Sequence, residues 1–157
     1  MSGEMVILSL GTADTLAALA KRHRVIAPKP GEAPASLVTQ ATHIVAEGAA
    51  ASLACQLALS HAGLVESLVL SAPESADDTL LARLGEIKAP CLLLLGSKAP
   101  ERLHAAMAAY QQRLPRATRI LIYGGERDLA TEPAWGRLVT DFIDRGERFV
   151  VNPGPQS

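Results

Sequence analysis

The sequence predicts a doubly wound α/β fold, in which a mainly six-stranded parallel sheet carries helices on both faces. Short apolar runs alternate with helix-like segments along the chain, an order typical of strands joined by crossover helices. The run 90–96 is apolar at nearly every position and is bounded by turn residues, as expected of a strand buried on both faces of a parallel sheet. Right-handed crossovers then place helices on both sides of the sheet.

Six segments have strand character. Each is short, rich in aliphatic residues and followed by glycine, proline or other small residues. One of them begins at His43 and runs into a turn of small residues at Ala46. The other five are Met5–Leu10, Arg24–Ala27, Ser67–Ser71, Pro90–Gly96 and Arg119–Tyr123.

Helices are predicted between these strands from capping residues and from apolar residues at helical spacing. Thr12 caps the first helix, Pro100 opens a later one, and the last spans Pro133–Asp144. Ser75 is the expected cap of a short helix whose first turn holds two aspartates, where carboxylates suit the helix dipole. The predicted buried positions are Leu16, Leu19 and Ala20; Leu80, Leu81 and Leu84; Leu103, Met107, Tyr110 and Leu114; and Leu138, Val139, Phe142 and Ile143.

Length and composition indicate one globular domain over residues 1–157, with a tail at 148–157. The chain is 48% hydrophobic and 20% charged, with a net charge of −1, so we expect no nucleic-acid partner. No apolar run approaches the roughly 20 residues that cross a bilayer, so no membrane role is expected. Cys55 and Cys91 lack metal or redox spacing, which favours buried thiols, no metal or cofactor, and a reduced, cytoplasmic setting.

The region 43–73 reads as strand, small-residue turn, helix and strand. It resembles the nucleophile elbow of the α/β-hydrolase family, where a GxSxG turn holds a serine above the sheet. Strand and helix nearly touch there, so the positions two residues either side of the nucleophile must be small. The nucleophile's position is Gly48, which suits a strained turn but carries no oxygen or sulfur. The five turn residues are Ala46, Glu47, Gly48, Ala49 and Ala50.

The resemblance covers residues 5–145 and implies a minimal α/β-hydrolase-like fold without the two N-terminal strands and without the lid. It also implies where an acid and a histidine should stand, in the chain order Ser, acid, His. The acid should follow the strand 91–95, but that position is Ala99. The histidine should follow the last strand, where the sequence has Arg127, or Asp128 if the alignment slips by one residue.

Other parts of the family's site are also altered. The loop after the first strand, which supplies an oxyanion donor in the family, has Leu10 and Gly11 in place of the usual His-Gly pair. Backbone donors from Ala49 and from the loop near Gly11 remain available. The resemblance places His43 and His61 where family members often carry structural histidines, and we expect His23 and His104 to be exposed or on a helix surface.

Three interpretations of function follow. The first is a non-catalytic homologue that binds a small molecule or a protein in the crevice at the ends of the strands. The second is a hydrolase with relocated groups, in which Glu47 or Asp128 acts as a base near the hydroxyls of Ser9 and Ser52. The third is structural, with a role in pairing through an exposed sheet edge. The alternative to the resemblance itself is an unrelated doubly wound domain that happens to contain a small-residue turn. The predicted crevice residues are Leu10, Gly11, Glu47, Gly48, Ala49, Arg127 and Asp128.

The predicted crevice contains groups of opposite charge. The helix after Gly48 begins with free N–H groups that would favour a carboxylate or a phosphate, and Arg127 would add a cation. Glu47 opposes an anion, and the alternative for Glu47 is a solvated loop residue.

The family's strand order also predicts an exposed sheet edge at Arg24–Ala27. Exposed edges pair readily with another chain, so we expect either a homodimer through this edge or a strand-like tail, Arg148–Asn152, that covers an edge.

Overall fold

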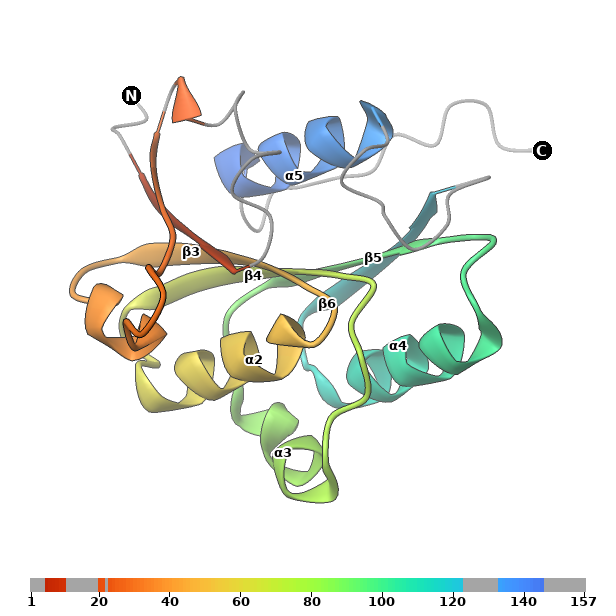
Figure 1. Ribbon diagram of the computed structural model, residues 1–157. Helices are drawn as coiled ribbons and strands as arrows, with labels where there is room; N and C mark the ends of the chain where they lie inside the picture. Colours follow the sequence, from red (N-terminus) through yellow and green to blue (C-terminus); the bar gives the residue numbers. More distant parts are fainter. Residues whose placement is uncertain (1–4, 11–19, 22, 123–132, 146–157) are drawn as a thin grey trace.

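The computed structural model describes residues 5–10, 20–21, 23–122 and 133–145 (Figure 1). Its six strands form one sheet in the order β2-β1-β3-β4-β5-β6, and every neighbouring pair is parallel. The six-stranded parallel sheet is therefore confirmed. The strands are β1 (Val6–Leu10), β2 (Arg24–Ile26), β3 (Thr42–Glu47), β4 (Val65–Ser71), β5 (Cys91–Gly96) and β6 (Ala117–Ile122).

Helices cover both faces of this sheet (Figure 1). On one face lie α2, α3 and α4, and on the other lies α5. This arrangement is the doubly wound one that the alternation of elements predicts. The helices are α2 (Ala50–Ser60), α3 (Asp78–Arg83), α4 (Glu101–Arg113) and α5 (Pro133–Arg145), with two 3₁₀ turns, η2 (Pro34–Leu37) and η3 (Leu84–Glu86).

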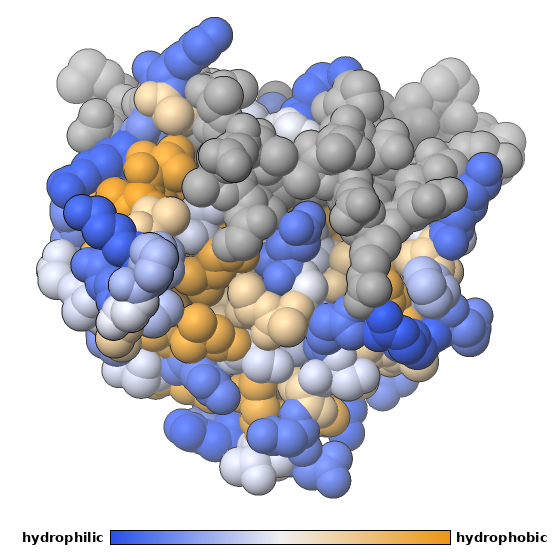
Figure 2. Space-filling model, in the orientation of Figure 1, coloured by the Kyte–Doolittle hydropathy of each residue, from blue (hydrophilic) through white to orange (hydrophobic). Residues whose placement is uncertain are grey.

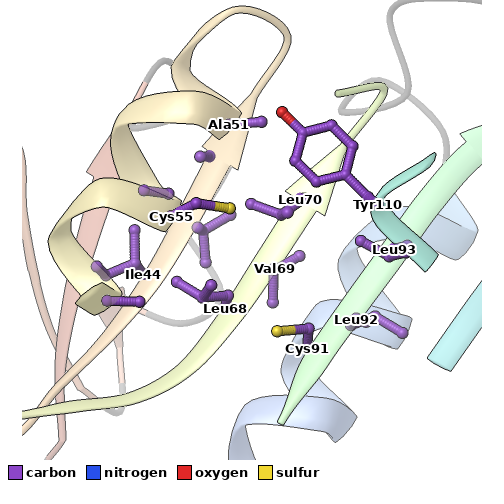
Figure 3. Packing of buried hydrophobic residues seen from close by; sticks show 14 of the residues in the cluster. Ile44, Ala51, Cys55, Leu68, Val69, Leu70, Cys91, Leu92, Leu93 and Tyr110 are labelled. Carbon is purple, nitrogen blue, oxygen red and sulfur yellow. The ribbon is translucent and has the colours of Figure 1, made fainter. Parts of the chain in front are cut away.

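The core is aliphatic and centres on β4 and β5, whose apolar side chains pack against α2 and α4 (Figure 3). All six residues of β5 are buried, which explains why its sequence is continuously apolar instead of alternating. The predicted stripe on α4 is confirmed, since all four of its residues are buried: Leu103, Met107, Tyr110 and Leu114.

The short helix α3 begins later than predicted. Its cap is Asp77 and not Ser75, because the Asp77 side chain accepts a hydrogen bond of 2.8 Å from the Leu80 backbone N–H. Only α3 and η3 connect β4 to β5, so no lid domain lies between these strands. The helix predicted after Thr12 and the tail Arg148–Asn152 lie outside the described residues.

Among the strands that the structure describes, β2 and β6 form the two edges of the sheet. The predicted edge at Arg24–Ala27 is therefore confirmed, as the three-residue strand β2. Within the described ranges, no helix is long and apolar enough to cross a membrane.

Candidate functional site

The turn between β3 and α2 has the geometry of a nucleophile elbow. β3 ends at Glu47, α2 begins at Ala50, and Gly48 between them has φ +61°. The Gly48 N–H donates to the Ser71 carbonyl at 2.9 Å, and its own carbonyl accepts from Ala51 at 3.2 Å. This sharp reversal leads directly from the end of a strand into the start of a helix, at the carboxyl end of the sheet.

Small residues make this reversal possible. Gly48 tolerates positive φ because it has no Cβ, and Ala46 is fully buried where β3 passes α2. A Cβ built on Gly48 meets no described heavy atom within 4 Å. A side chain therefore fits at position 48, and only the backbone conformation opposes it.

A second left-handed residue stands beside the first. Ala72 follows β4 with φ +45° and donates its N–H to the Leu94 carbonyl at 2.8 Å. Positive φ in a non-glycine residue costs about 1–2 kcal/mol and persists where the surroundings hold it. Neighbouring strands β3 and β4 therefore both end in left-handed turns, and the sequence predicts only the first of them.

The loop after β4 is tied to the turn and to α4 through Glu74. The Glu74 N–H donates to the Gly48 carbonyl at 3.1 Å, and its carbonyl accepts from the Tyr110 hydroxyl at 3.0 Å. The carboxylate of Glu74 accepts from Arg102 Nη1 at 2.6 Å. Figure 3 shows the Tyr110 hydroxyl beside the start of α2, near Ala51.

Tyr110 acts as a structural donor in this network. Burial raises the pKa of the Tyr110 phenol to about 12, although a hydrogen bond with Ser52 acts in the opposite direction. A phenol with this pKa stays protonated at neutral pH and is a poor base. The sequence predicts Tyr110 in the core but does not indicate the network, because Tyr110 and Glu74 lie 36 residues apart.

The residue that the resemblance to the family assigns to the acid is Ala99, whose methyl group is buried. Ala99 closes the turn after β5, with its N–H donating to the Gly96 carbonyl at 3.0 Å, and it is 8% exposed. An alanine cannot accept a hydrogen bond from a histidine. The histidine position, Arg127 or Asp128, lies outside the described residues, as does Gly11 of the oxyanion loop, whereas Leu10 is buried at the end of β1.

Glu47 is the acidic side chain at the turn itself. It is half-buried at the end of β3, with its Oε2 atom buried, so it is not the solvated loop residue of the sequence-based alternative. Ser71 lies opposite Glu47 in register on β4, and Ser9 lies opposite Val45 on β1. Ser9, Glu47 and Ser71 therefore share one face of the sheet near its carboxyl end.

Two histidines lie near the opposite, amino end of the sheet. His23, predicted to be exposed, is 5% exposed, because its Nδ1 accepts from the Met5 N–H at 3.3 Å and its Nε2 lies 3.1 Å from Asp144 Oδ1. His43 Nδ1 lies 2.7 Å from Ser67 Oγ. Burial lowers the pKa of His43, and Ser67 is too deeply buried to reach a substrate.

The remaining histidines do not complete a site at the turn. His61 follows α2 and lies 2.7 Å from Ser60 Oγ, while His104 is half-buried in the first turn of α4.

A cavity of about 210 Å³ lies between α2 and α3 instead of at the turn. Figure 2 shows hydrophilic and hydrophobic residues mixed over the part of the surface where these helices lie in Figure 1. The residues that line the cavity are Gln56, Leu59, Ser60, Asp77, Thr79, Leu80 and Arg83.

In the part of the chain that the structure describes, the side chains form no metal-ligand cluster, and both cysteine thiols are buried. There, histidine, cysteine and acidic side chains form no cluster of three that could hold a metal ion. Cys55 and Cys91 are buried free thiols on α2 and β5 (Figure 3), as predicted. Burial raises the pKa of Cys55 to about 12 and also raises that of Cys91, so both thiols stay protonated at neutral pH.

Comparison with solved structures shows the fold. The chain is similar to a predicted CIB-like hydrolase from Thermoplasma acidophilum, with a TM-score of 0.73, 16% identity, and coverage of 90% of this chain and 87% of that one. It is also similar to MGS-MChE2, an α/β-hydrolase from the metagenome of Mar Chica lagoon sediments, with a TM-score of 0.75, 13% identity, and coverage of 92% and 93%. For naproxen esterase from Bacillus subtilis the TM-score is 0.71, with 13% identity and coverage of 90% and 85%.

At these identities the likeness shows the fold alone. The chain therefore has the α/β-hydrolase fold, as its resemblance to the family predicts. No family model and no curated protein sequence matches it.

Proposed function

We propose that this α/β-hydrolase-fold protein binds a small molecule or a protein segment at the Gly48 turn and does not carry out serine-based hydrolysis there. One observation carries the proposal: the elbow geometry is present, but its central residue is a glycine with φ +61°. A covalent acyl-enzyme needs an oxygen or sulfur at this position, and glycine offers neither. The buried alanine at position 99 removes the acid as well.

The same turn keeps features that suit a ligand. The space around a Cβ at Gly48 is open to 4 Å among the described atoms, which leaves room for a ligand group where a nucleophile's side chain would otherwise stand. Apart from the Ala51 N–H, which donates to the Gly48 carbonyl, the first N–H groups of α2 have no partner within the helix in this kind of turn and can donate to a carbonyl or an anion. Glu74, Tyr110 and Arg102 hold one wall of this region in place.

The competing interpretation is a hydrolase with relocated groups, and the position of Glu47 favours it. A half-buried carboxylate beside the turn could accept a proton from water, whose oxygen would then attack an ester carbonyl and release the alcohol. Asp128 is the second candidate base from the sequence. This route needs neither a nucleophile at position 48 nor a histidine.

A side-by-side assay of p-nitrophenyl acetate hydrolysis tests the proposal. The proteins are the wild type, the triple variant Gly48→Ser, Ala99→Asp, Arg127→His, and a second triple variant with Asp128→His in place of Arg127→His. Gly48→Ala provides the matched control, since it imposes the same backbone strain without adding an oxygen. Circular dichroism and thermal unfolding confirm that each variant is folded.

We expect an inactive wild type, an inactive Gly48→Ala variant and measurable turnover in one of the two triple variants. That result would establish the alignment of the elbow and redirect the search to ligands. Wild-type turnover that is lost in Glu47→Gln or Asp128→Asn would contradict the proposal and establish the relocated chemistry.

A further inference from the structure

Charge is distributed unevenly along the chain. Residues 87–122, which form β5, α4 and β6 with their connections, contain six basic residues and one acidic residue, Glu101, for a net charge of +5. The whole chain has a net charge of −1. The segment that forms β5, α4 and β6 is therefore strongly basic, in a protein that is slightly acidic overall. The basic residues of the segment are Lys88, Lys98, Arg102, Arg113, Arg116 and Arg119.

Four of these residues gather around β6, and we call them the basic edge: Lys88, Arg113, Arg116 and Arg119. Arg116 Nη1 donates to the Lys88 carbonyl at 2.8 Å, which places the turn before β6 next to the segment that leads into β5. Arg113 is the last residue of α4, three positions before Arg116. All four side chains are exposed. Among the described residues, Arg83 pairs with Glu86 and Arg102 pairs with Glu74.

The strand that carries this charge is also an edge of the sheet. Among the described strands, β6 pairs only with β5, so its other side presents backbone N–H and C=O groups. Arg119 and Leu121 lie two residues apart on β6, so their side chains share one face of the strand. This is the face that α4 covers, because Arg119 Nη1 lies 3.4 Å from Oε1 of Gln111, a residue of α4. Leu121 is 43% exposed and is the only large hydrophobic residue so exposed among the described residues.

We propose that the β6 edge binds an extended acidic segment of a partner protein, which adds a strand to the sheet. Its main chain pairs with the side of β6 that faces away from β5, its carboxylates lie on the basic edge, and an apolar side chain covers Leu121. A second copy of the same edge fits poorly, because it would bring four cations against four. Nucleic acid would satisfy the charge but could not use the strand pairing or the apolar contact at Leu121.

Fluorescence anisotropy with a labelled peptide of alternating Glu and Val residues tests the proposal at 50 mM salt. Three further probes separate its parts: a Lys-Val peptide of the same length, a Glu-Pro peptide that cannot form a strand, and single-stranded oligo-dT as a polyanion. The test variant is Arg116→Glu, Arg119→Glu. The matched control is Arg24→Glu, Arg137→Glu, which changes the net charge equally on β2 and α5, where both arginines are exposed.

We expect the Glu-Val peptide to bind the wild type, and its affinity to fall at least tenfold in the Arg116→Glu, Arg119→Glu variant but less than twofold in the control. Hydrogen exchange of the amides of residues 118–121 should slow when the peptide is bound. Leu121→Ser should also weaken binding, and it provides a second test that leaves the charge unchanged.

Three results would overturn the proposal. Equal or tighter binding of the Glu-Pro peptide or of oligo-dT would mean that the basic edge attracts polyanions without strand addition. Equal binding of the Lys-Val peptide would mean that charge plays no part. No binding of the Glu-Val peptide at 1 mM would mean that the arginines serve only to keep sheet edges of different molecules apart.

Discussion

The amino and carboxyl ends of the sheet differ in their polar groups and in their backbone strain. At the amino end, His23 and His43 are both hydrogen-bonded to other parts of the chain, so their rings stabilise the fold. At the carboxyl end, the turns at Gly48 and Ala72 are held in left-handed conformations, and Ala99, which the resemblance assigns to the acid, is buried. The two histidines at the amino end contribute to packing, whereas the carboxyl end holds the strained turns where we propose that a ligand binds.

The comparison teaches that the geometry of an elbow and its chemistry are separable. The shape depends on small residues, on the Gly48 and Glu74 backbone hydrogen bonds and on the start of α2. The chemistry would require three side chains from three different loops. Each prediction below tests a feature of one end of the sheet against a matched control.

The largest effect is expected at the close approach of β3 and α2. Ala46→Leu should lower the free energy of unfolding by about 2–3 kcal/mol, because Ala46 is fully buried and three added carbon atoms would overpack the contact. Urea denaturation measures this change. Ala49→Leu is the matched control, since Ala49 is exposed, and it should change stability by less than about 0.5 kcal/mol. Equal costs at both positions would refute the close approach.

At the amino end, His23→Ala should cost about 2 kcal/mol. The variant leaves the Met5 N–H without its acceptor and Asp144 without the imidazole. His23→Gln can both accept and donate hydrogen bonds, so it should recover part of the loss. His61→Ala, at a less buried position, should change stability by less than about 0.5 kcal/mol. If His23→Ala and His61→Ala shifted the urea midpoint equally, the histidine network would not contribute to stability.

The strain at the elbow gives a smaller effect. Gly48→Ala should destabilise the protein by about 1 kcal/mol, because alanine at positive φ is strained even though its methyl group meets no described atom. Gly63 is the control, because a Cβ there also meets nothing within 4 Å and its φ lies outside the positive range. Gly63→Ala should be neutral or slightly stabilising. A neutral Gly48→Ala would mean that the turn relaxes out of the left-handed conformation.

The smallest effect is the pH dependence from His43. Burial is the main cause that lowers its pKa, and His23 lowers it further, whereas Glu66 and Asp144 raise it. The native state therefore favours the neutral imidazole, so this contribution to stability is complete above about pH 6.5 and is lost as pH falls below it. Stability curves for the wild type and His43→Gln should diverge below this pH, while His104→Gln should follow the wild type. Parallel curves for His43→Gln and the wild type would contradict the lowered pKa.

Much of the fold could be predicted from local sequence. Continuous apolar runs such as Cys91–Leu95 indicate strands buried on both faces, and the order of elements indicates a parallel sheet. The spacing of the apolar residues on α4 fixes its buried face correctly. At the candidate site, Ala46 and Gly48 indicate the turn, because the buried position 46 requires a small side chain and the positive φ at position 48 favours glycine. These predictions succeed because their physical cause lies within a few residues of the pattern.

Other features depend on groups far apart in the chain. His23 reads as an exposed residue, and only the contact with Asp144, 121 residues away, explains its burial. The link between Glu74 and Tyr110 leaves no trace in local spacing. The predicted cap of α3, Ser75, lies two residues before the actual cap, Asp77, since both are good caps and backbone geometry selects between them.

The alternation of strands and helices, the small-residue turn and the lack of a nucleophilic side chain at Gly48 all follow from the local chemistry of side chains. By contrast, contacts between distant parts of the chain are needed to explain the left-handed conformation of Ala72, the burial of His23 and of one Glu47 oxygen, and the network through Glu74. These features depend on contacts between separate elements. Such contacts exist only after the sheet has brought distant residues together.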